Sequence, residues 1–123
     1  MDAKVVDASA IAALLLGEPQ AEDIAQRLGD ARLIAPALLA FELANVCLVK
    51  RRRRPDQAST LTAAFGLRDR LAMEQIAVDH EGVLQLAAAT DLTAYDASYL
   101  WLARETGAEL ITLDRRLAEA ASM

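Results

Sequence analysis

The sequence is poor in several residue types, and each shortage excludes a kind of protein. The single cysteine, Cys47, excludes an intrachain disulfide, and its mostly apolar surroundings predict a buried side chain. With one histidine, His80, besides that cysteine, the chain lacks the usual ligands of a zinc site. No apolar run approaches the roughly 20 residues that span a bilayer, and the first residues lack the pattern of a signal peptide. We therefore expect no membrane segment, no targeting segment and a cytoplasmic location.

The overall composition indicates one compact domain spanning residues 1–123. Hydrophobic residues make up 54% of the chain but aromatic residues only 4%, which favours a helix-rich globular fold over disorder. The net charge of −5 argues against attraction of the whole protein to nucleic acid. However, Lys50–Arg54 forms an unbroken basic run, so the distribution of charge leaves an RNA partner open.

Short apolar runs alternate with helical patterns along the chain. Such alternation predicts parallel strands joined by helical crossovers, with helices on both faces of the sheet. We expect a three-layer α/β/α fold with a short parallel sheet of four to five strands. The predicted strands are 3–6, 33–35, 75–78 and 109–112; the predicted helices are 8–16, 20–28, 37–53, 56–71, 81–89, 93–106 and a last one opened by Asp114. Asp56 is the expected cap of the fourth helix, and Thr93 with Asp96 forms a capping box that opens the sixth.

Four acidic residues are predicted to meet at one edge of this sheet. Asp7 follows the first strand and Asp114 follows the last, while Asp96 begins a helix and Glu42 lies within the helix after the second strand. In open α/β sheets the functional site lies beyond the carboxyl ends of the strands. Clustered carboxylates repel one another unless a cation neutralises them. Hard oxygen ligands of this kind favour Mg²⁺ or Mn²⁺.

Each acid also has a structural interpretation that needs no metal. Asp7, Asp96 and Asp114 each lie where an aspartate can stabilise the start of a helix. Glu42 lies inside an apolar helix, where no cap is needed, and its alternatives are a solvent-facing side chain or an ion pair. Glu42 is therefore the most diagnostic of the four.

Four stretches, in order along the chain, resemble the motifs of the PIN-domain family, and most closely its VapC-type toxins. They are Val5–Ala10, Pro36–Val46, Leu92–Tyr99 and Leu110–Leu117. The resemblance implies a metal-dependent endoribonuclease that forms a homodimer and is inhibited by a cognate antitoxin. It also implies that Asp7, Glu42, Asp96 and Asp114 coordinate Mg²⁺ or Mn²⁺, and that the hydroxyls of Ser9 and Thr112 support the site.

Other polar and aromatic residues have less specific interpretations. The basic run is either a solvated helix end or a surface for RNA phosphates or acidic antitoxin residues. Arginines with this possible role are Arg51, Arg52, Arg53, Arg115 and Arg116. Tyr95, Tyr99 and Trp101 are expected in the core or at a dimer surface.

Three functional hypotheses account for these residues to different extents. An endoribonuclease explains all four acids, whereas a non-catalytic PIN-like interaction module that binds a protein or RNA leaves them without a task. A phosphotransfer receiver domain also gathers acids at a sheet edge, but it needs a lysine late in the chain. The only lysines are Lys4 and Lys50, which argues against a receiver domain.

Overall fold

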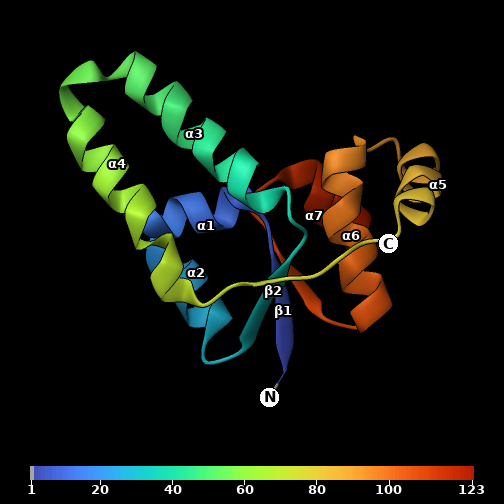
Figure 1. Cartoon of the computed structure of the whole chain (residues 1–123). Helices are drawn as coiled ribbons and strands as arrows, with labels where there is room; N and C mark the ends of the chain where they lie inside the picture. Colours follow the sequence, from blue (N-terminus) through green and yellow to red (C-terminus); the bar gives the residue numbers. More distant parts are fainter. Residues whose placement is uncertain (1) are drawn as a thin grey trace.

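The computed structural model describes residues 2–123 and contains a four-stranded, fully parallel sheet (Figure 1). The strands are β1 (Ala3–Val6), β2 (Arg32–Ala35), β3 (Glu74–Gln75) and β4 (Glu109–Ile111), in the order β3-β2-β1-β4. Val5 of β1 pairs with Ile34 on one side and Leu110 on the other. The predicted parallel α/β architecture is confirmed.

The helices begin and end close to the signals in the sequence. Pro55, which cannot continue a helix, follows the long third helix, and Gly107, with φ of 72°, ends the sixth. The helices are α1 (Ala8–Leu15), α2 (Ala21–Leu28), α3 (Leu39–Arg53), α4 (Ala58–Gly66), α5 (His80–Thr90), α6 (Ala94–Thr106) and α7 (Arg115–Ala121), with 3₁₀ turns η1 (Pro55–Gln57) and η2 (Leu67–Leu71).

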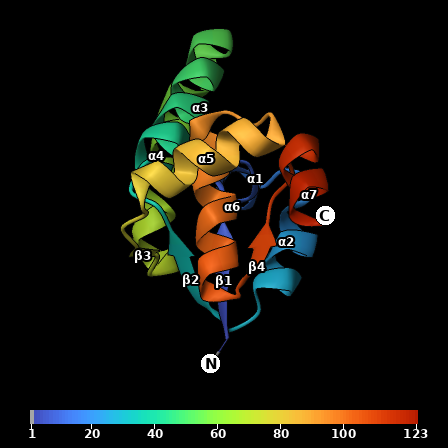
Figure 2. The ribbon, with the colours of Figure 1, turned by 90° about the vertical axis from the view of Figure 1, so that its right-hand side faces the viewer.

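Helices cover both faces of the sheet, as Figures 1 and 2 show. Successive strand residues point to opposite faces, so Val5 packs in one core with Leu100 of α6, while Val6 packs in the other with Ile11 of α1. This double burial explains why the strands are continuously apolar rather than alternating.

The strand order reverses direction at β1. The chain moves from β1 to β2 and then to β3 on one side, and returns through α5 and α6 to place β4 on the other side of β1. The carboxyl ends of β1 and β4 therefore flank a topological switch point, the usual position of a site in open α/β sheets. The backbone N–H of Asp7 donates to the carbonyl of Ile111 at 3.2 Å, which closes the two strands together there.

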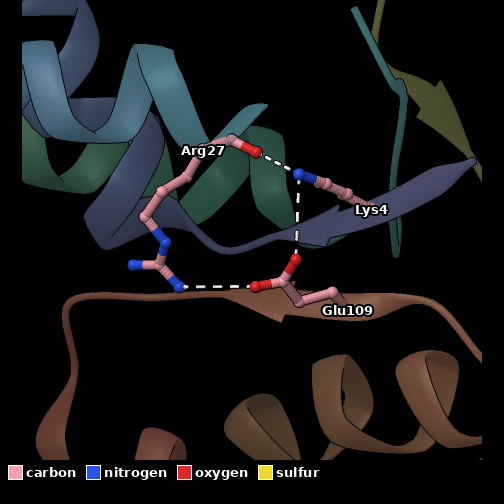
Figure 3. A network of polar contacts seen from close by, with 3 residues as sticks. All are labelled: Lys4, Arg27 and Glu109. Atoms are coloured by element: carbon pink, nitrogen blue, oxygen red, sulfur yellow. Dashed lines mark hydrogen bonds and ion pairs between the residues drawn. The ribbon is translucent and has the colours of Figure 1, made fainter. Parts of the chain in front are cut away.

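The opposite, amino-terminal end of the sheet carries a network of opposite charges (Figure 3). Lys4 on β1 donates to the backbone carbonyl of Arg27 at the end of α2, and its ammonium lies 3.7 Å from a carboxylate oxygen of Glu109. The Arg27 guanidinium lies 3.8 Å from the other carboxylate oxygen of Glu109. This network joins β1, β4 and α2.

Helices α3 and α4 pack side by side as an arm that extends away from the sheet (Figure 1). The basic run forms the last turn of α3 at the end of this arm, and Lys50 forms an ion pair with Glu18 at 3.1 Å. Cys47 is buried on α3, as predicted. Within residues 2–123, none of the helices combines the length and the apolar character needed to cross a bilayer.

Two local predictions were wrong. The strand expected at 75–78 is β3, only Glu74–Gln75, because Ile76 and Val78 pack against the core as an extended segment after one last ladder bond to Ala35. Asp56 does not cap α4: it lies in η1, and Gln57 precedes the helix without a side-chain cap.

Candidate active site

Asp7 is the most constrained of the four predicted acids. It is the N-cap of α1, only 5% exposed, and its Oδ1 accepts from the backbone N–H of Ala10 at 3.1 Å and from the Ser9 hydroxyl at 2.7 Å. The Thr112 hydroxyl donates to its Oδ2. The capping interpretation of Asp7 is thus correct, and the same carboxylate faces β4.

Ser9 and Thr112 join Asp7 to the turn after β4. The backbone N–H of Leu113 donates to the Ser9 hydroxyl oxygen at 2.9 Å, and that of Asp114 donates to the Thr112 hydroxyl oxygen at 3.0 Å. Each hydroxyl therefore accepts a hydrogen bond from this turn and donates one to the Asp7 carboxylate. The structure thus places the Ser9 and Thr112 hydroxyls beside Asp7.

Asp114 and Asp96 enter the site from helix starts. Asp114 is the N-cap of α7, and its Oδ1 accepts from the backbone N–H of Leu117 at 2.9 Å. Asp96 lies in the first turn of α6, where its backbone N–H donates to the Thr93 hydroxyl at 3.1 Å. The predicted Asp114 cap exists and uses only one of its carboxylate oxygens. At Asp96 only the Thr93 half of the capping box is present, and this bond uses the backbone N–H of Asp96 and not its carboxylate.

Glu42 follows neither of its structural interpretations. It is half-buried in the first turns of α3 and accepts a 2.6 Å hydrogen bond from the hydroxyl of Tyr99 on α6. Residues 2–123 place no cation within ion-pair distance of it in the structure. Its hydrogen bond to Tyr99 places Glu42 between α3 and α6, near the other predicted acids.

The four acids, here called the acid cluster, lie close enough to disturb one another electrostatically. Burial raises the pKa of Asp7, and the charge of Asp114 adds to the rise against hydrogen bonds from Thr112, Ser9 and Ala10. Burial raises the pKa of Asp96, helped by Asp114 and Asp7.

Glu42 shares this electrostatic environment. Burial raises the pKa of Glu42, helped by Asp96 and Asp7 and opposed by the bond from Tyr99. The cluster is thus a local accumulation of negative charge that costs free energy at neutral pH.

The donor set suits a hard divalent cation, since it consists of carboxylate oxygens and nearby hydroxyls. As the side chains lie, no three acidic, histidine or cysteine residues within 2–123 are arranged to hold a metal ion. Asp7, Asp114 and Glu42 each direct an oxygen to a hydroxyl or backbone donor. The chemistry of the donors, carboxylate and hydroxyl oxygens, is what fits such a cation.

The predicted basic residues divide into two groups. Arg116 lies beside the acid cluster: its charge lowers the pKa of Asp96 against the effect of burial, and it pairs with Asp91 at 3.5 Å. Arg115 is exposed on the same helix start. The second group, on the arm, consists of Arg51, which donates to Thr62 at 3.2 Å, and the exposed Arg52 and Arg53.

Tyr99 is the site residue that sequence reasoning missed. Its prediction as a core residue is correct, since it is 1% exposed, but its hydroxyl contact to the acid cluster was not predicted. The available signal was its spacing from Asp96, because residues three apart share a helix face. Tyr95 and Trp101 differ from it: Tyr95 is 65% exposed, and Trp101 packs against α5.

Comparison with known proteins now identifies the class. The PIN-domain family model matches residues 4–123, and the chain belongs to the PIN-domain family. Among its relatives, Ribonuclease VapC3 of Pyrobaculum aerophilum is 38% identical over 94% of this chain and 92% of its own. Ribonuclease VapC9 of Mycobacterium tuberculosis is 37% identical over 94% and 88%. The crystal structure of PAE2754 from Pyrobaculum aerophilum superposes with a TM-score of 0.79 and 25% identity, covering 98% of this chain and 79% of that one.

Proposed function

We propose that this protein is a Mg²⁺- or Mn²⁺-dependent endoribonuclease, the toxin of a toxin–antitoxin pair, which hydrolyses RNA phosphodiester bonds. The observation that carries the proposal is the acid cluster, in which four carboxylates from four separate parts of the chain gather at the switch point of the sheet. Membership of the PIN-domain family supports the proposal. It is also supported by relatives that are named ribonucleases and that match this chain over nearly their whole length.

Within this proposal the acids divide the work of the site. Asp7, Asp96 and Asp114 would hold the cation, and Glu42 would share that role or orient the attacking water. When bound, a divalent cation lowers the pKa of water and stabilises charge on the phosphate and the leaving oxygen. Ser9 and Thr112 keep the Asp7 carboxylate in one orientation through their hydrogen bonds. Hydrolysis leaves a 5′-phosphate on one fragment and a 3′-hydroxyl on the other.

The test compares an acid inside the cluster with an acid outside it. We expect the wild type to cut RNA with Mg²⁺ or Mn²⁺ and to lose cleavage in EDTA. Asp96→Asn should lower the rate at least roughly 100-fold, given that even supporting residues of metal sites contribute 10–100-fold. Asp30→Asn, an exposed aspartate at the other end of the sheet, should cut like the wild type.

Two results would count against the proposal. Cleavage by Asp96→Asn at the wild-type rate, in protein free of contaminating nuclease, would exclude the assigned site. A wild type that cuts no RNA and shows no divalent binding by calorimetry would favour the alternative, a non-catalytic PIN-like interaction module.

We also propose that the protein forms a homodimer. An apolar groove runs between α3, α5 and the segment after β3, and its exposed members include Phe41 at 82% and Leu84 at 62%. Large apolar side chains gathered on a surface are typical of protein interfaces. Leu84→Glu should convert a dimer into a monomer in sedimentation measurements, whereas a wild type that sediments as a monomer would exclude the dimer.

The arginines have two proposed partners, RNA phosphates and acidic residues of an antitoxin. Each phosphate contact adds to the salt dependence of RNA binding. Replacing Arg52 and Arg53 with alanine should therefore reduce the salt slope of RNA affinity if the arm contacts RNA. An unchanged slope with weaker antitoxin binding would assign the arm to the antitoxin.

A further inference from the structure

We propose that Tyr99 is a positioning residue that holds Glu42 in the acid cluster, a role that rests on the proposed ribonuclease function. The Tyr99 hydroxyl donates to Oε1 of Glu42 at 2.6 Å. This distance lies in the range of charge-assisted bonds from hydroxyls to carboxylates, which are stronger than neutral ones. The contact joins α6, which carries Asp96, to α3, which carries Glu42.

Tyr99 is rigid enough to hold another side chain in place. It is 1% exposed and packs in the core between the sheet and α6 with Val5, Ile34 and Leu39. A ring packed on all sides cannot change rotamer without opening a cavity. The position of its hydroxyl is therefore set by the core and not by the site.

Glu42, in contrast, is not held in the site by its own packing. Its side chain has three rotatable bonds and is only half-buried, and the charges of Asp96 and Asp7 oppose its ionised form. Among residues 2–123, Tyr99 is the hydrogen-bond donor to its carboxylate. Without that bond, repulsion favours rotamers directed to solvent. With it, Oε1 is held and Oε2 is left for the chemistry of the site.

The same helix offers a matched control. Tyr95 lies one turn before Tyr99 on α6, but it is 65% exposed, and no hydrogen bond of its hydroxyl is present within the described residues. Tyr95→Phe and Tyr99→Phe thus remove the same atom from the same helix, one from solvent and one from Glu42.

The experiment measures Mn²⁺ affinity by calorimetry without RNA, and kcat and KM for RNA cleavage. We expect Tyr99→Phe to weaken Mn²⁺ binding several-fold and to lower kcat roughly 10–100-fold, as loss of a supporting residue does, with KM within about two-fold. Tyr95→Phe should change none of these values. Thermal unfolding of each variant verifies that it is folded at the assay temperature.

A double-mutant cycle separates positioning from general stabilisation of the core. In a Glu42→Ala background the hydroxyl has no carboxylate to hold, so Tyr99→Phe should lower kcat by less than about two-fold more, as expected for residues that act as a unit. Equal fold-losses in both backgrounds would overturn the positioning role, and so would wild-type Mn²⁺ affinity and kcat in Tyr99→Phe. A wild type that cuts no RNA overturns the ribonuclease function instead, while the calorimetric comparison still decides whether Tyr99 acts through Glu42.

Discussion

The two ends of the parallel sheet differ in how their charged side chains are arranged. At the amino end, Lys4 and Arg27 surround Glu109, so opposite charges lie together (Figure 3). At the carboxyl end, the acid cluster gathers like charges, and the pKa values of Asp7, Glu42 and Asp96 are raised. One end satisfies the usual rules of stability, and the other violates them.

This difference indicates that the amino end of the sheet is arranged for stability, whereas the arrangement of the carboxyl end lowers stability. A network of opposite charges needs nothing further to account for it. A cluster of like charges at a switch point lowers stability unless a ligand neutralises it, and such local violations are expected at functional sites. Four measurements test this contrast.

The largest effect is expected from neutralising Asp7. Asp7→Asn should reduce RNA cleavage at least roughly 100-fold, yet leave the free energy of unfolding in EDTA at pH 7.5 unchanged or raised. Asparagine keeps an acceptor for the N–H of Ala10 and is as good a cap as aspartate, while a buried charge is removed. Urea denaturation and a cleavage assay give the two values. A large loss of stability with cleavage retained would reverse the assignment of this end of the sheet.

A divalent cation should stabilise the carboxyl end. At a free Mn²⁺ concentration 100 times its Kd, the wild type should gain about 2.7 kcal/mol of unfolding free energy. Asp96→Asn should lose most of that gain, whereas Glu109→Gln at the other end should retain it. Thermal unfolding with and without Mn²⁺ provides the measurement. Equal stabilisation of wild type and Asp96→Asn would mean that Mn²⁺ binds elsewhere.

Without cation, the acid cluster should make the protein more stable as the pH falls from neutral towards the ordinary carboxyl pKa of about 4. A carboxyl whose pKa is raised by folding binds its proton more tightly in the folded state. Its stabilising effect is complete below the unfolded pKa of about 4 and is lost as the pH rises through the raised value. Asp7, Glu42 and Asp96 share this sign, whereas the pKa of Glu74 is lowered by Arg32, and Glu74 acts in the opposite direction at lower pH.

Melting temperatures in EDTA across this window would detect the effect. Asp7→Asn should flatten the pH profile, and the difference between the two proteins isolates the cluster from other titrating groups. A melting temperature of the wild type that falls steadily as the pH is lowered from neutral, in parallel with Asp7→Asn, would contradict the raised pKa values.

Local sequence patterns were sufficient to predict the strands that are buried on both faces. Val5-Val6 and Leu33-Ile34 are short apolar runs bounded by polar residues, and they form β1 and β2. The prediction for the edge strand β3 was wrong, because Ile76 and Val78 pack their apolar side chains against the core without forming part of the strand. Whether an apolar side chain belongs to a strand or to a covering segment depends on tertiary neighbours that local periodicity does not encode.

The candidate site divides in the same way. The positions of Asp7 and Asp114 follow from the rule that sites in open α/β sheets lie beyond the carboxyl ends of the strands. Glu42 was singled out because an acid inside an apolar helix has no capping role. The spacing of Tyr99 from Asp96 indicates a shared helix face, but the partner of its hydroxyl could not be assigned from the sequence, because Glu42 lies 57 positions away on another helix. The approach of α6 to α3 decides that contact, and this approach is a property of the packed core.

The smallest effect is expected at the amino end. Glu109→Gln removes the carboxylate that pairs with Lys4 and Arg27, at side-chain exposures of 57% for Glu109, 23% for Lys4 and 38% for Arg27. Water and salt screen such pairs, so the loss of unfolding free energy should be about 0.2–1 kcal/mol, and smaller at high salt. Cleavage should be unchanged, since the network lies at the other end of β1 and β4 from the acid cluster. Urea denaturation at two salt concentrations measures the effect. A loss several times larger, or reduced cleavage, would mean that the two ends are coupled through the strands. The charge network at the amino end and the acid cluster at the carboxyl end would then not be independent.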